Sequence, residues 1–133
     1  MRIAFYGSAA AVSGAETALL RQREVCEATL RPGEEIVAVF FDVAPRVPLT
    51  KTKVPDGFGL ERDGCLADLL AHVAAPSRRF DAVAVASADR LTRRPDTLRE
   101  ILRRITQASV ALRIAGLPQP VSGDRVSCPM AGE

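Results

Sequence analysis

Long hydrophobic runs are missing from this sequence of 133 residues. No apolar stretch approaches the roughly 20 residues that a membrane helix needs, and the apolar start at Ile3–Tyr6 is ended by Gly7 and Ser8, too early for the core of a signal peptide. Hydrophobic residues make up 47% and charged residues 26%, a balance typical of soluble globular proteins. We therefore expect a single domain without a membrane contact, located in the cytoplasm.

The residues that usually hold metals or disulfides are scarce. The three cysteines, Cys26, Cys65 and Cys128, are odd in number and form no C-x-x-C pair, and the single histidine, His72, lies inside a helical pattern. Gly7 and Gly14 do not fit a phosphate-binding loop or a dinucleotide motif, and no lysine follows them. We expect reduced thiols, a structural histidine, and neither a metal nor a cofactor.

Lysine is also rare, because Lys51 and Lys53 are the only two and every other basic residue is arginine. A GC-rich coding bias would produce this without any function. The guanidinium group nevertheless suits phosphate recognition, which makes nucleic acid a partner to test. The arginines crowd the part of the chain after residue 77: Arg78, Arg79, Arg90, Arg93, Arg94, Arg99, Arg103, Arg104 and Arg113.

Apolar runs without a polar face alternate along the chain with segments whose apolar residues recur at the spacing of a helix. The apolar runs predict strands near residues 2–6, 36–42, 80–86 and 109–115. The segments with helical spacing predict helices over about 13–30, over about 63–74, and from Pro95 onward. Ser13 and Glu16 have the spacing of a helix capping box. This alternation favours an α/β fold with a mainly parallel four-stranded sheet flanked by helices, whose ligands bind at the carboxyl ends of the strands.

Two segments are rich in turn-forming residues and show no helical or strand periodicity. Residues 42–60 predict a long surface loop, and residues 117–133 have the proline and glycine content of a flexible tail. We therefore assign the folded domain to residues 1–116.

The segment Asp89–Arg93 reads D-R-L-T-R and directly follows the predicted strand at 80–86. Arg90 and Arg93 are spaced to lie on one side of the chain at the start of a helix, where a phosphate would be held by charge-assisted bonds. The plainer interpretation is a solvated turn in which Asp89 caps the helix and pairs with one arginine.

Three motifs together resemble the catalytic domain of serine recombinases, the resolvase/invertase family. F-D-A-V-A-V-A-S-A-D-R-L-T-R-R is similar to the family strand that ends in D-R-L-S-R. R-I-A-F-Y-G and the later L-L-R-Q-R resemble the opening strand, its Y-x-R-V-S-T loop and the L-x-x-Q helix. Arg62–Leu70 resembles the R-P-G-L-x-x-L-L element. The motifs stand in the family order between residue 2 and about residue 115.

The resemblance implies a resolvase-like domain in which a serine attacks a DNA phosphate and an arginine cluster stabilises the transition state without a metal. Arg62, Arg90 and Arg93 match the cluster, Asp89 matches the carboxylate that orients it, and Gln22 matches the polar position of the first helix. We expect the three arginines to converge beside residues 7–11.

The opening loop departs from the family pattern. Ser8 stands at the arginine position and Ala10 at the position of the nucleophilic serine, and a methyl group cannot attack a phosphate. Neither Ser8, two residues away, nor Ser13 is expected to replace it. Nothing after Gly116 resembles the long dimerising helix or the DNA-binding domain that follow in the family.

These features leave three hypotheses open. The chain is a recombinase-type domain associated with DNA recombination that cannot cleave DNA, or a regulator that pairs with an intact recombinase, or a component of an active recombinase that uses a displaced serine. The expected partners are DNA, bound weakly through its backbone phosphates, and a second copy of the chain or an intact recombinase.

Overall fold

The structure, a computed structural model, describes residues 1–44 and 59–115. The predicted tail at 117–133 and Cys128 lie outside these residues, as does most of the predicted loop at 42–60.

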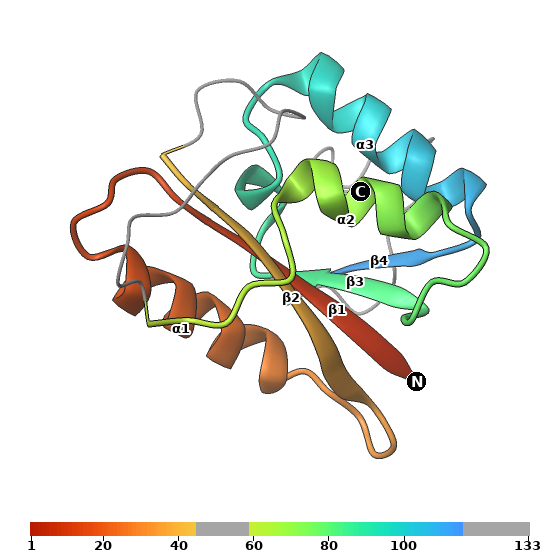
Figure 1. Cartoon of the computed structure of the whole chain (residues 1–133), viewed down its shortest axis with the longest axis horizontal. Helices are drawn as coiled ribbons and strands as arrows, with labels where there is room; N and C mark the ends of the chain where they lie inside the picture. Colours follow the sequence, from red (N-terminus) through yellow and green to blue (C-terminus); the bar gives the residue numbers. More distant parts are fainter. Residues whose placement is uncertain (45–58, 116–133) are drawn as a thin grey trace, which may run out of the picture.

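Four strands form one parallel sheet in the order β2-β1-β3-β4 (Figure 1). The strands are β1 (Arg2–Ala9), β2 (Glu35–Val43), β3 (Ala82–Val85) and β4 (Ala111–Ile114), and the helices are α1 (Ala15–Glu27), α2 (Leu66–Ala74) and α3 (Pro95–Gln107). A short 3₁₀ turn, η1 (Ala88–Arg90), follows β3. The predicted α/β class, the parallel sheet and the order of the elements are confirmed.

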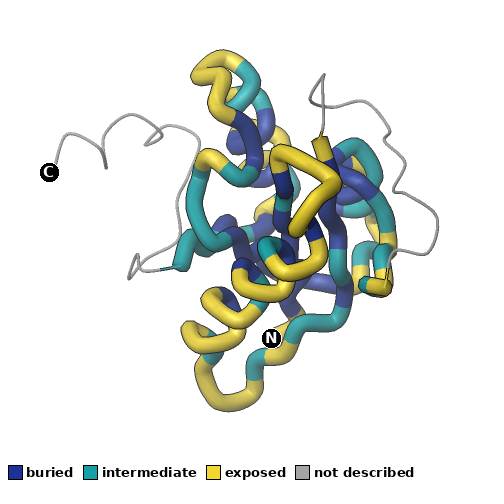
Figure 2. Tube along the Cα trace, turned by 90° about the vertical axis from the view of Figure 1, so that its left-hand side faces the viewer, coloured by how far each residue is buried: buried dark blue, intermediate teal, exposed yellow. Residues whose placement is uncertain are grey.

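The helices form a layer on each side of the sheet. In Figure 1, α1 lies on one side, whereas α2 and α3 lie next to each other on the opposite side. Figure 2 shows that burial is concentrated in the sheet between the layers, while the outer surfaces of the helices are exposed. Because helices cover both faces of the sheet, the strands are buried on both sides and carry no polar face.

Alternate residues of the strands serve the two layers. On the side of α2 and α3, Tyr6 and Phe40 join the cluster that contains Leu69 and Ile101. On the side of α1, the core is split into two smaller clusters, one around Phe5 and one around Leu19, Phe41 and Val43. His72 packs against Phe40, with 5.6 Å between the ring centroids, in agreement with a structural histidine.

The start of α1 differs from the predicted capping box. The N-cap is Gly14, which has a φ of 76°, and no side chain caps the helix. Because glycine adopts this left-handed conformation without steric cost, the helix begins at Ala15, one residue later than a Ser13 cap requires. Glu16 instead accepts a hydrogen bond from the N–H of Gly59 at 3.1 Å. The capping role of Ser13 was therefore wrong.

Cys26 and Cys65 are not joined in a disulfide, and both are buried. Burial of Cys26 in α1, reinforced by the nearby charge of Glu27, raises the pKa of its thiol to about 11. An unfolded cysteine titrates near a pKa of about 8.5. The unfolded chain therefore loses this proton at a lower pH than the folded chain does.

We expect the free energy of unfolding to fall between about pH 8.5 and pH 11, because within that window the unfolded state binds fewer protons than the folded state. Cys26 accounts for about 3 kcal/mol of this loss, because the window spans roughly 2.5 pH units and each unit corresponds to about 1.4 kcal/mol. Urea denaturation across the window should show a shallower decline for Cys26→Ala than for the wild type. Parallel declines would contradict this assignment.

Within residues 1–44 and 59–115, no helix combines the length and the apolar character that crossing a membrane requires.

Candidate functional site

The order of the strands creates a topological switch between β1 and β3. The chain leaves β1 toward α1 on one face of the sheet and leaves β3 toward α3 on the other face (Figure 1). Ligands of sheets wound in this way bind where such connections diverge, at the carboxyl ends of the strands. We call residues 8–14, at and after the end of β1, and residues 86–94, after β3, the switch-point edge.

The β1 side of the switch-point edge is held by Gln22. The side-chain amide of this α1 residue donates from Nε2 to the carbonyl of Ser8 at 2.7 Å, and its Oε1 accepts from the N–H of Ser8 at 3.0 Å. Gln22 is only 5% exposed, so its amide is enclosed by its surroundings. Ala10, at the predicted nucleophile position, follows the strand and is exposed.

Gly7, next to Ser8 in β1, is closely packed against neighbouring side chains. A Cβ atom on Gly7 would lie 2.8 Å from the ring of Phe5 and 3.0 Å from both Oε1 of Gln22 and Cδ2 of Leu19. Only glycine lets the strand approach α1 this closely. The end of β1 is therefore fixed from the α1 side by both packing and hydrogen bonds.

The β3 side carries the D-R-L-T-R segment. Asp89 is exposed and accepts a short hydrogen bond from the hydroxyl of Ser87. Nε of Arg90 is buried without a hydrogen-bond partner among the described residues. Arg93 is exposed and forms no ion pair with the residues that the structure describes. The plainer interpretation, in which Asp89 pairs with one of these arginines, is not what the structure shows.

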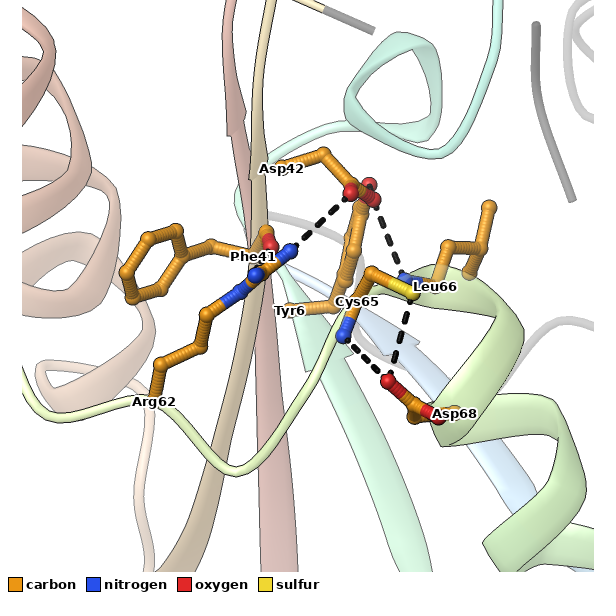
Figure 3. A network of polar contacts seen from close by, with 7 residues as sticks. All are labelled: Tyr6, Phe41, Asp42, Arg62, Cys65, Leu66 and Asp68. Atoms are coloured by element: carbon orange, nitrogen blue, oxygen red, sulfur yellow. Dashed lines mark hydrogen bonds and ion pairs between the residues drawn. The ribbon is translucent and has the colours of Figure 1, made fainter. Parts of the chain in front are cut away.

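Arg62 belongs to a different network, drawn in Figure 3. Its Nε donates to the carbonyl of Phe41 at 3.0 Å, one terminal nitrogen lies 3.3 Å from Oδ1 of Asp42, and the guanidinium lies 5.3 Å from the centroid of the Phe41 ring. Arg62 thus neutralises a carboxylate within the domain.

Asp42 is the centre of that network. Its carboxylate is almost fully buried and accepts from the hydroxyl of Tyr6 at 2.7 Å and from the N–H of Leu66, at the start of α2, at 3.0 Å (Figure 3). Burial, followed by the charge of Asp42, raises the pKa of Tyr6 well above its usual value, so the phenol remains a hydrogen-bond donor. One carboxylate therefore joins β1, β2 and the start of α2.

Asp42 was not among the predicted site residues, although it lies next to the switch-point edge. In the parallel register, Ser8 of β1 is the partner of Asp42 in β2, and neighbouring strands are about 4.8 Å apart. The signal was available, because Asp42 directly follows the apolar run Ile36–Phe41 at a carboxyl end of the sheet. The prediction placed it where the strand at 36–42 meets the loop at 42–60 and gave it no role.

The structure connects some of the predicted site residues directly. Ser8 contacts both Gln22 and Arg90 by hydrogen bonds, whereas Arg62 is paired with Asp42 and Asp89 with Ser87. Convergence of Arg62, Arg90 and Arg93 on one phosphate remains a prediction. Within the described ranges, no group of three or more His, Cys, Asp or Glu side chains is placed to hold a metal ion.

Models of protein families and curated proteins give no match to this chain. Solved structures do. The C-terminal catalytic domain of ISC1926 TnpA, an IS607-like serine recombinase, aligns with a TM-score of 0.53 and 20% identity over 86% of this chain and 70% of its own. The N-terminal catalytic domain of TP901-1 integrase aligns with a TM-score of 0.57 and 18% identity over 86% of this chain and 77% of its own. The chain thus has the fold of these recombinase catalytic domains.

Proposed function

We propose that the chain is a serine-recombinase-type domain of DNA recombination that contacts backbone phosphates but does not cleave DNA. The observation that carries the proposal is the state of the two arginines at the switch-point edge. Arg90 has a buried Nε without a partner among the described residues, and Arg93 is exposed there without an ion pair. Guanidinium donors left in this state suit the oxygens of a phosphate.

The residue at the nucleophile position supports the second half of the proposal. The side chain of Ala10 is a methyl group and offers no oxygen nucleophile. The hydroxyl of Ser8 is already donated to the carbonyl of Arg90 at 2.8 Å, which directs it at the backbone of the β3 side. Covalent catalysis needs an activated nucleophile aligned with the phosphate, and neither position supplies one.

The proposal predicts weak DNA binding that depends on salt and not on sequence. About two neutralised phosphates correspond to a loss of roughly 10-fold in affinity between 50 and 200 mM salt. Fluorescence anisotropy with two duplexes of unrelated sequence should give similar dissociation constants. Arg90→Gln and Arg93→Gln should each weaken binding to both duplexes and lower the salt slope by about 1.

Arg99→Gln provides the matched control, because Arg99 is an exposed arginine of α3 that pairs with Asp96 at 2.9 Å. It should change the affinity by less than Arg90→Gln does. Nanomolar binding to one duplex and not to the other at physiological salt would contradict the proposal, since phosphate contacts carry no sequence information.

A further inference from the structure

Ser8 is the residue where the two sides of the switch-point edge meet. The ladder between β1 and β3 covers only Ile3–Phe5 opposite Ala82–Ala84, whereas β1 continues to Ala9 along β2. Beyond the ladder, Oγ of Ser8 donates to the carbonyl of Arg90 at 2.8 Å. Among the described residues, no other hydrogen bond joins segment 8–14 to segment 86–94.

The same residue is anchored at its backbone. Gln22 from α1 binds both the N–H and the carbonyl of Ser8, so the strand cannot shift or rotate here without breaking two hydrogen bonds. The contacts therefore form a continuous series from the buried amide of Gln22 through the backbone of Ser8 and its hydroxyl to the backbone of Arg90. The backbone of η1 at Arg90 is thus held in a fixed position relative to α1.

The bond from Ser8 is made to the carbonyl of Arg90 and not to its guanidinium. Arginine has five N–H donors and no acceptor, so a serine hydroxyl that holds the main-chain oxygen leaves every side-chain donor available. One of these donors, Nε–H, is buried and has no partner among the described residues. Such a group is costly to leave unpaired, which makes an anion oxygen a favourable partner for it.

We propose that Ser8 is a positioning residue that fixes the backbone of Arg90 so that its guanidinium is presented to a phosphate. The inference rests on the proposed function for the identity of the ligand. It assigns to Ser8 a part in phosphate binding that does not require its hydroxyl to touch the phosphate.

The test compares Ser8→Ala, which removes the hydroxyl, with Ser8→Thr, which keeps one. Thr29→Ala is the matched control, because Oγ1 of Thr29 donates to the carbonyl of Cys26 at 2.7 Å, the same kind of bond at the far end of α1. The full chain is used throughout. The measurements are urea stability, duplex affinity by anisotropy, and the NMR signal of the Arg90 Nε–H, assigned by its loss in Arg90→Gln and followed with inorganic phosphate as the probe.

We expect Ser8→Ala to shift the Arg90 Nε–H signal of the free protein and to weaken duplex binding about 3- to 10-fold, the scale of one ordinary hydrogen bond. Ser8→Thr should bind within about 2-fold of the wild type. Thr29→Ala should lose stability but retain both the signal and the affinity. An unchanged signal and affinity in Ser8→Ala would overturn the inference.

A different result would count against the proposed function. If Arg90→Gln binds the duplex as tightly as the wild type does, Arg90 is not a phosphate contact. The Nε–H signal of the free protein then tests only whether Ser8 fixes Arg90: a shift in Ser8→Ala supports this fixing, and no shift overturns it.

Discussion

Asp42→Ala is expected to destabilise the domain by about 3–5 kcal/mol, the range for removing one partner of a buried ion pair. The substitution leaves the Arg62 guanidinium, the Tyr6 hydroxyl and the N–H of Leu66 without the carboxylate that accepts from them. Because small domains are stable by only about 5–15 kcal/mol, this is a large share of the total. Urea denaturation followed by circular dichroism measures it.

Two further variants make the result specific. Asp96→Ala removes a carboxylate that is 97% exposed and pairs with Arg99 at 2.9 Å, and exposed pairs contribute about 0–1 kcal/mol. Tyr6→Phe should cost less than Asp42→Ala, and the two changes together should cost less than the sum of their separate effects, because they remove the same hydrogen bond. A loss below about 1 kcal/mol in Asp42→Ala would contradict the central role of this carboxylate.

The main architecture could be predicted because three independent signals agreed. Strands without a polar face require cover on both sides, and the helical stripes around Leu69 and Ile101 supply that cover. The alternation of strands and helices along the chain then favours a parallel sheet. Element ends were less certain: β1 runs to Ala9, past its predicted end at Tyr6, because its pairing with β2 continues to Val43.

The local detail could not be predicted where two patterns competed. Ser13 and Glu16 have the spacing of a capping box, but a glycine follows Ser13 and starts the helix in its place. Cys65, which no pattern marked, occupies the N-cap of α2, where Asp68 accepts from its N–H at 3.1 Å. Spacing identifies a motif, whereas backbone conformation decides which residue occupies the cap.

The residues of the candidate site remain a prediction from the sequence, and the structure adds the contacts that they make. The motif at 89–93 predicted Arg90 and Arg93. The family resemblance of the first helix predicted Gln22, whose side chain binds the backbone of Ser8 in the structure. The partner of Arg62 depends on a carboxylate from β2 that is distant in sequence, and no local pattern reveals it. Side-chain pairing across strands depends on register, which the sequence alone left open.

The wild-type protein is expected to form no covalent adduct with DNA. In a comparable hydrolase, loss of the nucleophile alone lowers the rate by about a million-fold, and here the residue at that position is an exposed alanine. The assay incubates the chain with a suicide DNA substrate, which traps a protein–DNA intermediate, and separates the products on a denaturing gel. No protein–DNA band should appear.

The double change Ser8→Arg with Ala10→Ser supplies the two groups that the family resemblance implies, and it is the variant most able to yield a band. It also removes the bond from Ser8 to the carbonyl of Arg90, so a restored nucleophile would act beside a less firmly held arginine. Ala10→Ser alone keeps that bond and separates the two effects. Because attack tolerates only about an ångström of misplacement, we expect that Ser8 does not replace the missing oxygen while its hydroxyl is directed at the carbonyl of Arg90. A band from the wild-type chain that disappears in Ser8→Ala or Ser13→Ala would show that a displaced serine cleaves DNA after all.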